Sequence, residues 1–304
     1  MQKLGRYLLE DRLGAGSFAT VWKAYDPELD TDVAVKVLAD NWASNADVRE
    51  RFLAEARLLR RISSPRVVRV HDVGVQDERP YFVMDYVRGG TLAEQVGHCG
   101  PAEALRLAAE AGCAVQVLHD AGVIHRDVKP SNLLLDAGRT PAAVLVADLG
   151  SAKQLADASG LTVTTGTPAY MAPEQAFQTS GFDARADVYA LGVVAFELLT
   201  GHKPFGAGGW ATLTPAEASA STLPTVSGEG ESEALDGIDA LLRAALSFDP
   251  DDRPQSAQIF AAALSGGGGE WAARTGPSGP RPGVVWLAAV VTFLVTAGLT
   301  WLAR

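Results

Sequence analysis

The stretch His125-Arg126-Asp127-Val128-Lys129-Pro130-Ser131-Asn132, followed sixteen residues later by Asp148-Leu149-Gly150, is the most informative part of this chain. Transfer of a phosphoryl group requires a carboxylate that orients a hydroxyl nucleophile, an amide and a second carboxylate that hold a metal ion, and a cation beside the transferring phosphate. The stretch supplies these groups, in that order, as Asp127, Asn132, Asp148 and Lys129. The pattern therefore predicts a phosphoryl-transfer site whose metal ligands are Asn132 and Asp148.

Apolar runs flank this loop, with Gly122-Val123-Ile124 before it and Leu133-Leu134-Leu135 after it, and we expect both to be strand-like and to hold the loop rigidly. On these motifs the chain resembles the bacterial members of the eukaryotic-like Ser/Thr protein kinases, over residues 6–264. The resemblance implies an α+β, bilobal fold and transfer of the ATP γ-phosphate to protein Ser or Thr hydroxyls. It also implies Mg2+ as the cofactor, with Mn2+ as a substitute.

The pattern along the chain divides the expected domain into two lobes. Residues 7–87 alternate between apolar runs and turns, with one helical stretch at about 47–62, and predict a small sheet lobe over residues 6–87. Helical periodicity dominates afterwards, which predicts a mostly helical lobe over residues 88–264.

A glycine-rich stretch near the N-terminus resembles the loop with which kinases cover the phosphates of ATP. The third glycine of that pattern is replaced by Ala19, and we expect its methyl group to weaken nucleotide binding somewhat. The resemblance assigns nucleotide contacts in this stretch to Leu13, Gly14, Ala15, Gly16, Ser17, Phe18, Ala19 and Val21.

Lys36 closes the apolar run Val33-Ala34-Val35, where a cation needs a partner. Glu55 shares a helix face with apolar residues three, four and seven positions away, so its carboxylate is predicted to point inward. The resemblance implies that Lys36 pairs with Glu55 and with the ATP phosphates. It places the adenine against the backbone of Asp85 and Val87, beyond Met84.

The residues after the metal-binding carboxylate carry regulatory features by resemblance. Lys129 is typical of Ser/Thr kinases, and Leu149 stands in place of the usual phenylalanine without an expected loss of function. Arg126 is a cation that a phosphate on the activation segment would neutralise. The candidate phosphorylation sites are Thr162, Thr164 and Thr165. Two structural pairings are expected as well: Glu174 with Arg253, and Asp187 with the backbone of the catalytic loop.

The composition and the C-terminal segment bear on partners and location. With 36 acidic and 26 basic residues the net charge is -10, which gives no electrostatic support to a nucleic-acid partner. Residues 265–283 are rich in Gly, Pro and Ser and predict a linker. Residues 284–303 carry no charge and are long enough to cross a bilayer as a helix. We expect a single-pass anchor in the cytoplasmic membrane with the kinase domain on the cytoplasmic side.

Three alternatives remain open from the sequence. Small residues at intervals of four in the anchor (Ala288, Thr292, Thr296 and Thr300) suggest a homodimer, although chance spacing explains them too. Ala19 and Leu149 motivate a membrane-anchored pseudokinase scaffold, against which all four chemical residues argue. Membrane attachment motivates a lipid or small-molecule kinase, whereas the docking stretch that ends at Glu174 favours a protein substrate.

Overall fold

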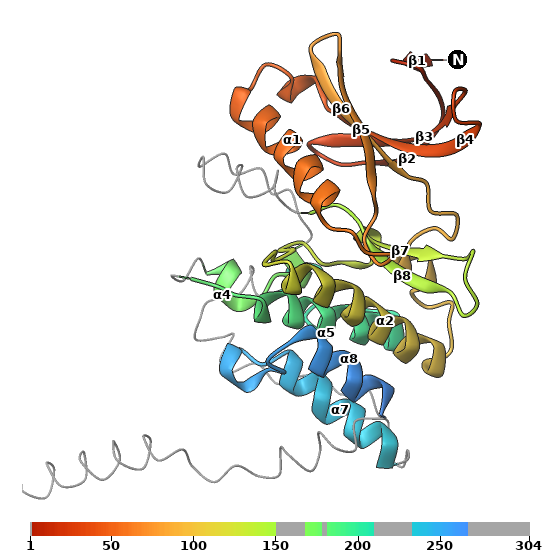
Figure 1. Ribbon diagram of the computed structural model, residues 1–304. Helices are drawn as coiled ribbons and strands as arrows, with labels where there is room; N and C mark the ends of the chain where they lie inside the picture. The colour runs from red at the N-terminus through yellow and green to blue at the C-terminus, as the bar shows by residue number, and fades with distance from the viewer. Residues whose placement is uncertain (1, 150–167, 178–180, 210–232, 267–304) are drawn as a thin grey trace, which may run out of the picture.

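The described part of the chain, residues 2–149, 168–177, 181–209 and 233–266, forms a β-rich lobe above a helical lobe in the computed structural model (Figure 1). The small lobe is an antiparallel sheet of six strands in the order β1-β2-β3-β4-β6-β5 with one α-helix. Its elements are β1 (Gln2–Leu4), β2 (Tyr7–Ala15), β3 (Ala19–Asp26), β4 (Thr31–Leu38), the 3-10 turn η1 (Asp40–Trp42), α1 (Ala46–Arg61), β5 (Val70–Gln76) and β6 (Arg79–Asp85). The bilobal α+β arrangement expected from the sequence is confirmed, and the sheet begins at Gln2, ahead of the predicted boundary at residue 6.

Strand β4 explains why Lys36 lies on the inner side of this sheet. Val33, Val35 and Val37 pack in a cluster on one face with Tyr7 and Tyr81. The alternate residues Ala34 and Leu38 belong to the larger core on the other face. Because side chains alternate along a strand, Lys36 shares the face of Ala34 and Leu38 and points toward the side that α1 covers.

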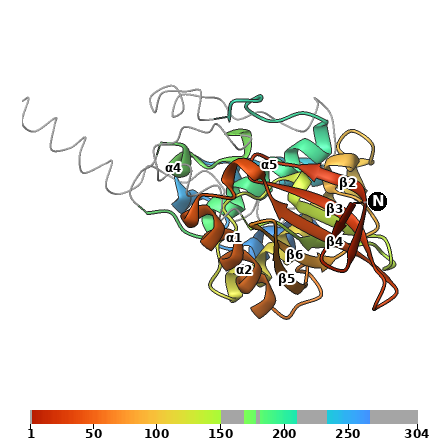
Figure 2. The same cartoon turned by 90° about the horizontal axis from the view of Figure 1, so that it is seen from above.

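Helix α1 presents Glu55 on its buried face. The Asn45 side chain caps the helix by accepting a hydrogen bond from the Val48 amide at 3.1 Å. Phe52 contacts Phe82 of β6 with ring centroids 5.0 Å apart. Figure 1 shows α1 beside the small-lobe sheet and above the helices of the other lobe, and Figure 2 gives the view from above, in which α1 overlies α2. The same face that carries Phe52 therefore directs Glu55 toward the sheet.

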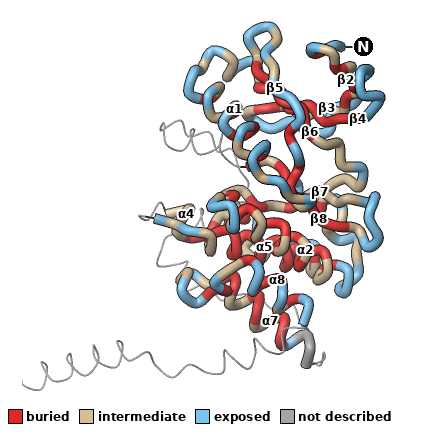
Figure 3. The backbone as a smooth tube through the Cα atoms, in the orientation of Figure 1, coloured by how far each residue is buried: buried red, intermediate tan, exposed pale blue. Residues whose placement is uncertain are grey.

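The helical lobe is built around α5, whose side chains are buried along most of its length (Figure 3). A Cβ atom at Gly192 of α5 would lie 3.0 Å from the Cβ atom of Ala245, so this glycine permits close packing of two helices. The lobe contains η2 (Leu92–Gln95), α2 (Pro101–Asp120), η3 (Pro130–Asn132), β7 (Leu133–Asp136), β8 (Ala143–Val146), η4 (Pro168–Tyr170), α4 (Pro173–Ala176), α5 (Arg185–Thr200), α7 (Glu233–Ala245), η6 (Pro250–Asp252) and α8 (Ala257–Ser265).

One predicted element is wrong: the run Gly122-Val123-Ile124 is not a strand. It closes helix α2. Gly122 has φ +73° and donates to the His119 carbonyl at 2.9 Å, and the Val123 amide donates to the Leu118 carbonyl at 2.9 Å. These are the bonds of a glycine-terminated helix end, in which a left-handed residue returns the chain over the last turn. The run Leu133-Leu134-Leu135 does form a strand, as part of β7.

The predicted C-terminal segments lie mostly outside the described residues. Helix α8 ends at Ser265, one residue past the predicted domain end. Within the ranges described, no helix combines the length and the apolar character needed to cross a bilayer. The segment 284–303 is not among those ranges, so the anchor stays a prediction.

Candidate active site

In the catalytic-loop stretch, Lys129 and Asn132 both contact the carboxylate of Asp127. Lys129 Nζ lies 2.7 Å from Asp127 Oδ2. Asn132 Nδ2 donates to the main-chain oxygen of Asp127 at 2.9 Å and to its Oδ2 at 3.2 Å. The sequence predicted that these residues share one tight loop, and the structure brings them together with the Asp127 carboxylate at the centre.

Asp187 holds the backbone that carries this carboxylate. Its side chain is buried and accepts hydrogen bonds from the amides of His125 (2.7 Å) and Arg126 (2.8 Å). A third contact comes from His119 Nε2 at 2.8 Å. Arg126 has φ +67°, a left-handed conformation that costs free energy for a residue with a side chain. Hydrogen bonds to a buried carboxylate are among the stronger ones in proteins, so Asp187 can hold the loop in this conformation.

The β7–β8 hairpin places Asn132 and Asp148 at the same end. Leu133 pairs with Val146, and the Ala147 amide donates to the Asn132 carbonyl at 2.9 Å. Asn132 immediately precedes β7, and Asp148 follows β8 by two residues. The local pairing of two short strands therefore assembles the two predicted metal ligands.

The oxygen atoms at this end of the hairpin fit a hard divalent cation. Asp148 Oδ1 lies 2.8 Å from Lys36 Nζ. Apart from that ion pair, this oxygen atom of Asp148 is buried and has no hydrogen-bond partner among the described residues. Carboxylate and side-chain amide oxygens, which Asp148 and Asn132 supply, are the ligand types that such cations prefer. Among the described residues, no three or more His, Cys, Asp or Glu side chains form a group that could hold a metal ion, so the predicted site combines one carboxylate with one amide.

Lys36 links the two lobes. Its Nζ atom lies 2.8 Å from Glu55 Oε1 in α1 and 2.8 Å from Asp148 Oδ1 below. Lys36 is 8% exposed and Glu55 is 1% exposed. Burial alone lowers the pKa of Lys36, but the carboxylates of Asp148 and Glu55 more than offset it, so the pKa lies above its ordinary value. The predicted Lys36–Glu55 pair is present, and the lysine is charged at neutral pH.

The glycine-rich stretch forms the turn between β2 and β3. The Gly16 amide donates to the Ala19 carbonyl at 2.9 Å and closes this turn. All residues from 10 to 17 are exposed, whereas Ala19 is 8% exposed and belongs to the main core. Ala19 and Val21 lie two positions apart on β3 and so share a face. The alanine methyl group therefore packs against protein atoms of the main core.

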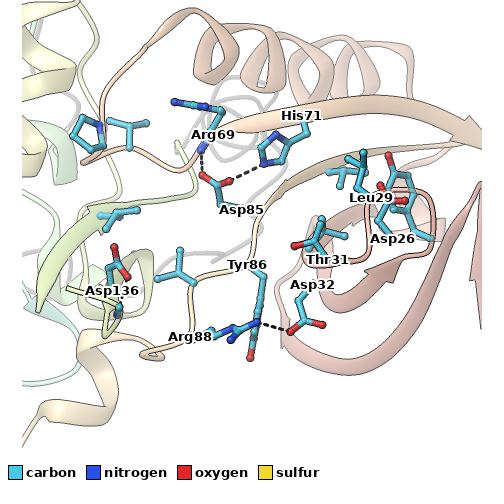
Figure 4. A pocket seen from close by; sticks show the side chains of 18 of the residues that line it. Asp26, Leu29, Thr31, Asp32, Arg69, His71, Asp85, Tyr86, Arg88 and Asp136 are labelled. Atoms are coloured by element: carbon cyan, nitrogen blue, oxygen red, sulfur yellow. Dashed lines mark hydrogen bonds and ion pairs between the residues drawn. The ribbon is translucent and has the colours of Figure 1, made fainter.

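Asp85, at the end of β6, is held both through its side chain and through its backbone amide. Asp85 accepts a hydrogen bond from the Arg69 amide at 3.1 Å, and its other oxygen lies 2.7 Å from His71 Nε2 (Figure 4). These side chains line a cavity of about 600 Å³ that includes Val87 but none of Lys36, Asp127 and Asp148. The Asp85 amide in turn donates to the Arg69 carbonyl at 3.1 Å. The contact of this backbone with an adenine ring stays a prediction.

Comparison with known proteins places this geometry in a family. The family model described as the protein kinase domain matches residues 7–264. The chain belongs to the protein kinase family. Family membership implies the use of ATP and a divalent metal ion.

Relatives of this kinase domain include bacterial enzymes. The chain is 39% identical over 298 residues to "Serine/threonine-protein kinase PknJ" of Mycobacterium tuberculosis, covering 93% of this chain and 49% of that relative. It is 37% identical over 279 residues to "Serine/threonine-protein kinase PkaA" of Streptomyces coelicolor, covering 84% of this chain and 48% of that relative. The chain thus spans about half the length of these relatives.

A solved structure also resembles this kinase domain. The crystal structure of the Mycobacterium tuberculosis PknI kinase domain superposes with a TM-score of 0.66 at 28% sequence identity. The match covers 88% of this chain and 98% of that one. The likeness extends over both lobes and not only over the motifs from which the sequence was first interpreted.

A buried ion pair joins two distant parts of the helical lobe of the kinase domain. Arg253 is 1% exposed, and its two terminal nitrogens contact the two carboxylate oxygens of Glu174 at 2.7 Å each. The guanidinium group also donates to the carbonyls of Ser247 and Phe248. The predicted pairing is present, and its bidentate geometry fixes the end of the activation segment to the lobe.

Several predicted positions lie outside the described residues, namely the candidate phosphorylation sites Thr162, Thr164 and Thr165. Leu149 is described and is buried, with 5% exposure. An apolar contact in place of the usual phenylalanine is therefore retained.

Two functional contributors were missed from the sequence. His125 is fully buried, and its ring contacts the Ala147 carbonyl at 3.2 Å and accepts from the Asp127 amide at 3.3 Å. It thereby joins the catalytic loop to the strand that leads to Asp148. Its place beside Arg126 and Asp127 was a signal that could have indicated this role. His119, the third partner of Asp187, lies in the last turn of the long helix α2 and gave no comparable signal.

Proposed function

We propose that the protein is a Ser/Thr protein kinase that transfers the γ-phosphate of ATP to protein hydroxyl groups with Mg2+ as the metal. The observation that carries the proposal is Lys36 Nζ, which lies 2.8 Å from both Glu55 and Asp148. A nucleotide-aligning cation, a helix carboxylate and a metal-binding carboxylate are thus assembled across the two lobes. The named relatives support the same activity, although each is about twice as long as this chain.

The catalytic loop supplies the groups that act on the protein substrate. Asp127 orients the Ser or Thr hydroxyl and accepts its proton as the new oxygen–phosphorus bond forms and the bond to ADP breaks. Lys129, already 2.7 Å from Asp127, balances the charge of the transferring phosphoryl group. Asn132 and Asp148 would hold the metal, which neutralises phosphate charge when bound. Lys129 also supports Ser and Thr over Tyr as substrates, by family resemblance.

Regulation by self-phosphorylation is part of the proposal. Arg126 directly precedes Asp127, and its guanidinium group lies 4.8 Å from the ring centroid of Phe182. A phosphate on Thr162, Thr164 or Thr165 would provide an anion for this cation and order the activation segment.

The membrane location is proposed on the uncharged segment 284–303 alone. As a single helix it would anchor the kinase domain to the cytoplasmic membrane and could support a homodimer. Deleting residues 284–304 should move the protein from the membrane fraction to the soluble fraction while ATP binding persists. An unchanged membrane fraction would contradict the anchor.

The alternative function is a pseudokinase scaffold, for which Ala19 and Leu149 are the motivating substitutions. The intact ion pairs of Lys36 favour catalysis over this alternative. The deciding experiment compares the full chain with its Asp127→Asn variant after incubation with magnesium and ATP, with phosphate sites located by mass spectrometry. We expect phosphate on the activation-segment threonines in the parent alone. ATP binding without phosphate on the chain or on an added protein substrate would favour the scaffold.

A further inference from the structure

The tip of the glycine-rich loop contacts a tryptophan from a different part of the small lobe. Phe18 stacks on Trp42, with ring centroids 5.1 Å apart and planes inclined by 28°. Trp42 Nε1 also donates to the Ser17 carbonyl at 2.9 Å. A second hydrogen bond runs from the Ala39 amide to the Phe18 carbonyl at 2.8 Å. Two consecutive loop residues are therefore held by the segment that follows β4.

Trp42 also lies at the start of the helix that carries Glu55. It ends the turn η1, and its own carbonyl accepts a hydrogen bond from the Asn45 amide at 3.0 Å. Asn45 is the N-cap residue of α1. One residue thus contacts the loop through its ring and the helix N-terminus through its backbone. The path from loop to helix runs through two consecutive contacts, from Phe18 to Trp42 and from Trp42 to Asn45.

We propose that Trp42 is a positioning residue for the nucleotide site, which ties closure of the glycine-rich loop to the placement of α1. The inference rests on the proposed use of ATP. The loop benefits from such a tie because residues 13–17 are all exposed, so that the pairing of β2 with β3 supports their backbone but the core does not hold their side chains. A loop that spends only a fraction of the time in its binding conformation lowers the apparent affinity for ATP by that fraction. Trp42 raises that fraction without touching the nucleotide.

The experiment measures the affinity of the full chain for the β,γ-imido analogue of ATP by calorimetry, which needs no catalysis. Trp42→Leu removes both the stack and the hydrogen bond, and we expect binding about tenfold weaker. Trp42→Phe retains a ring but loses the hydrogen bond to Ser17, and we expect about threefold weaker binding. In turnover assays the Leu variant should raise KM for ATP while kcat falls by less than about twofold, since Asp127 and Lys36 are untouched.

The matched control is Trp22→Phe, because Trp22 is a half-buried tryptophan of the same lobe that packs on the opposite side of the sheet. Its affinity should stay within about twofold of the parent. If Trp42→Leu does not fold, Phe18→Leu removes the same stack from the loop side and should weaken binding to a similar extent. Affinity within about twofold of the parent in a folded Trp42→Leu or Phe18→Leu variant would overturn the inference.

Hydrogen exchange tests the link to α1 separately. The analogue should slow exchange of the amides in the first turn of α1 in the parent and in Trp22→Phe, but not in Trp42→Leu. Equal protection in all three proteins would show that loop and helix are not coupled through Trp42. The two proposals can fail separately. A parent protein that binds the analogue but transfers no phosphate would refute the kinase activity, and the comparison of analogue affinities among the Trp42 variants would still test the role of Trp42.

Discussion

In the catalytic loop His125 is fully buried, and Asp187 accepts hydrogen bonds from the His125 and Arg126 amides at 2.7 and 2.8 Å. In the glycine-rich loop residues 13–17 are all exposed, and the tip is held by one aromatic stack and by hydrogen bonds between neutral groups. Hydrogen bonds to a charged group contribute about 1.5–3 kcal/mol each, against about 0.5–1.5 kcal/mol for neutral ones. The catalytic loop is therefore held more strongly than the glycine-rich loop.

The difference corresponds to what each loop has to do. A group that reacts must stay within a few tenths of an ångström of its productive position, because misplacement by about 1 Å can cost about a hundredfold in rate. A loop that covers a nucleotide must open to admit it and to release the product. Buried charge-assisted bonds suit the first task, and a few exposed contacts suit the second.

The largest expected effect tests the chemical side of this contrast. Asp127→Asn keeps the shape of the side chain but removes the carboxylate that accepts the hydroxyl proton. We expect kcat to fall by about 10²–10⁴-fold, far more than any substitution in the glycine-rich loop. Steady-state kinetics with a protein substrate measures it, with thermal unfolding to show that the fold is kept. A residual rate within tenfold of the parent would mean that another group takes the proton.

The second prediction concerns Lys36, where the two lobes meet. Lys36→Met leaves the Glu55 carboxylate buried without this cation, and we expect about 3–5 kcal/mol of lost stability together with lost activity. Replacing the pair by Lys36→Met with Glu55→Leu should recover most of the stability but none of the activity. Urea unfolding and kinase assays check both. A stable, well-folded single variant would show that the pair contributes little to the fold.

The third prediction tests how far Asp187 fixes the catalytic loop. Asp187→Asn replaces a charged acceptor by a neutral side-chain amide, whose NH2 group cannot accept the hydrogen bonds that the His125 and Arg126 amides donate. We expect a loss of about 2–3 kcal/mol in the free energy of unfolding. Exchange of the His125 and Arg126 amides should quicken more than that of the loop around Gly16. Asp183→Asn is the control, since that side chain is 56% exposed and its loss should cost under about 1 kcal/mol. Similar losses for the two variants would argue against a special role for Asp187.

The smallest effect is expected in the glycine-rich loop itself. Ala19→Gly restores the third glycine, and we expect the affinity for ATP to improve by about twofold, since one methyl group borders the nucleotide space. The same change should cost about 0.5–1 kcal/mol of stability, because glycine in a strand loses more conformational freedom on folding. Calorimetry and thermal unfolding measure the two effects. Weaker binding by the glycine variant would show that the methyl group supports the loop.

Much of the site was predictable because it is encoded over short distances. The spacing from His125 to Asn132 fits one tight loop, and the register of two adjacent short strands brings Asn132 beside Asp148. The periodicity of α1 predicted that Glu55 faces inward with Phe52. The same local reasoning failed at Gly122-Val123-Ile124, where apolar residues suggested a strand but a left-handed glycine closes helix α2.

By itself, the sequence determined which residues can do chemistry and which face of each element is apolar, because both are set by residue type and by the repeat of a helix or strand. Only the tertiary structure decided which distant groups meet. Three sets of contacts join residues that are far apart along the chain. They are the two 2.8 Å contacts of Lys36, the hydrogen bonds of His119 and the catalytic loop with Asp187, and the stacking of Phe18 on Trp42. An apolar period specifies that a face is buried, but the partner buried against it depends on how whole elements pack.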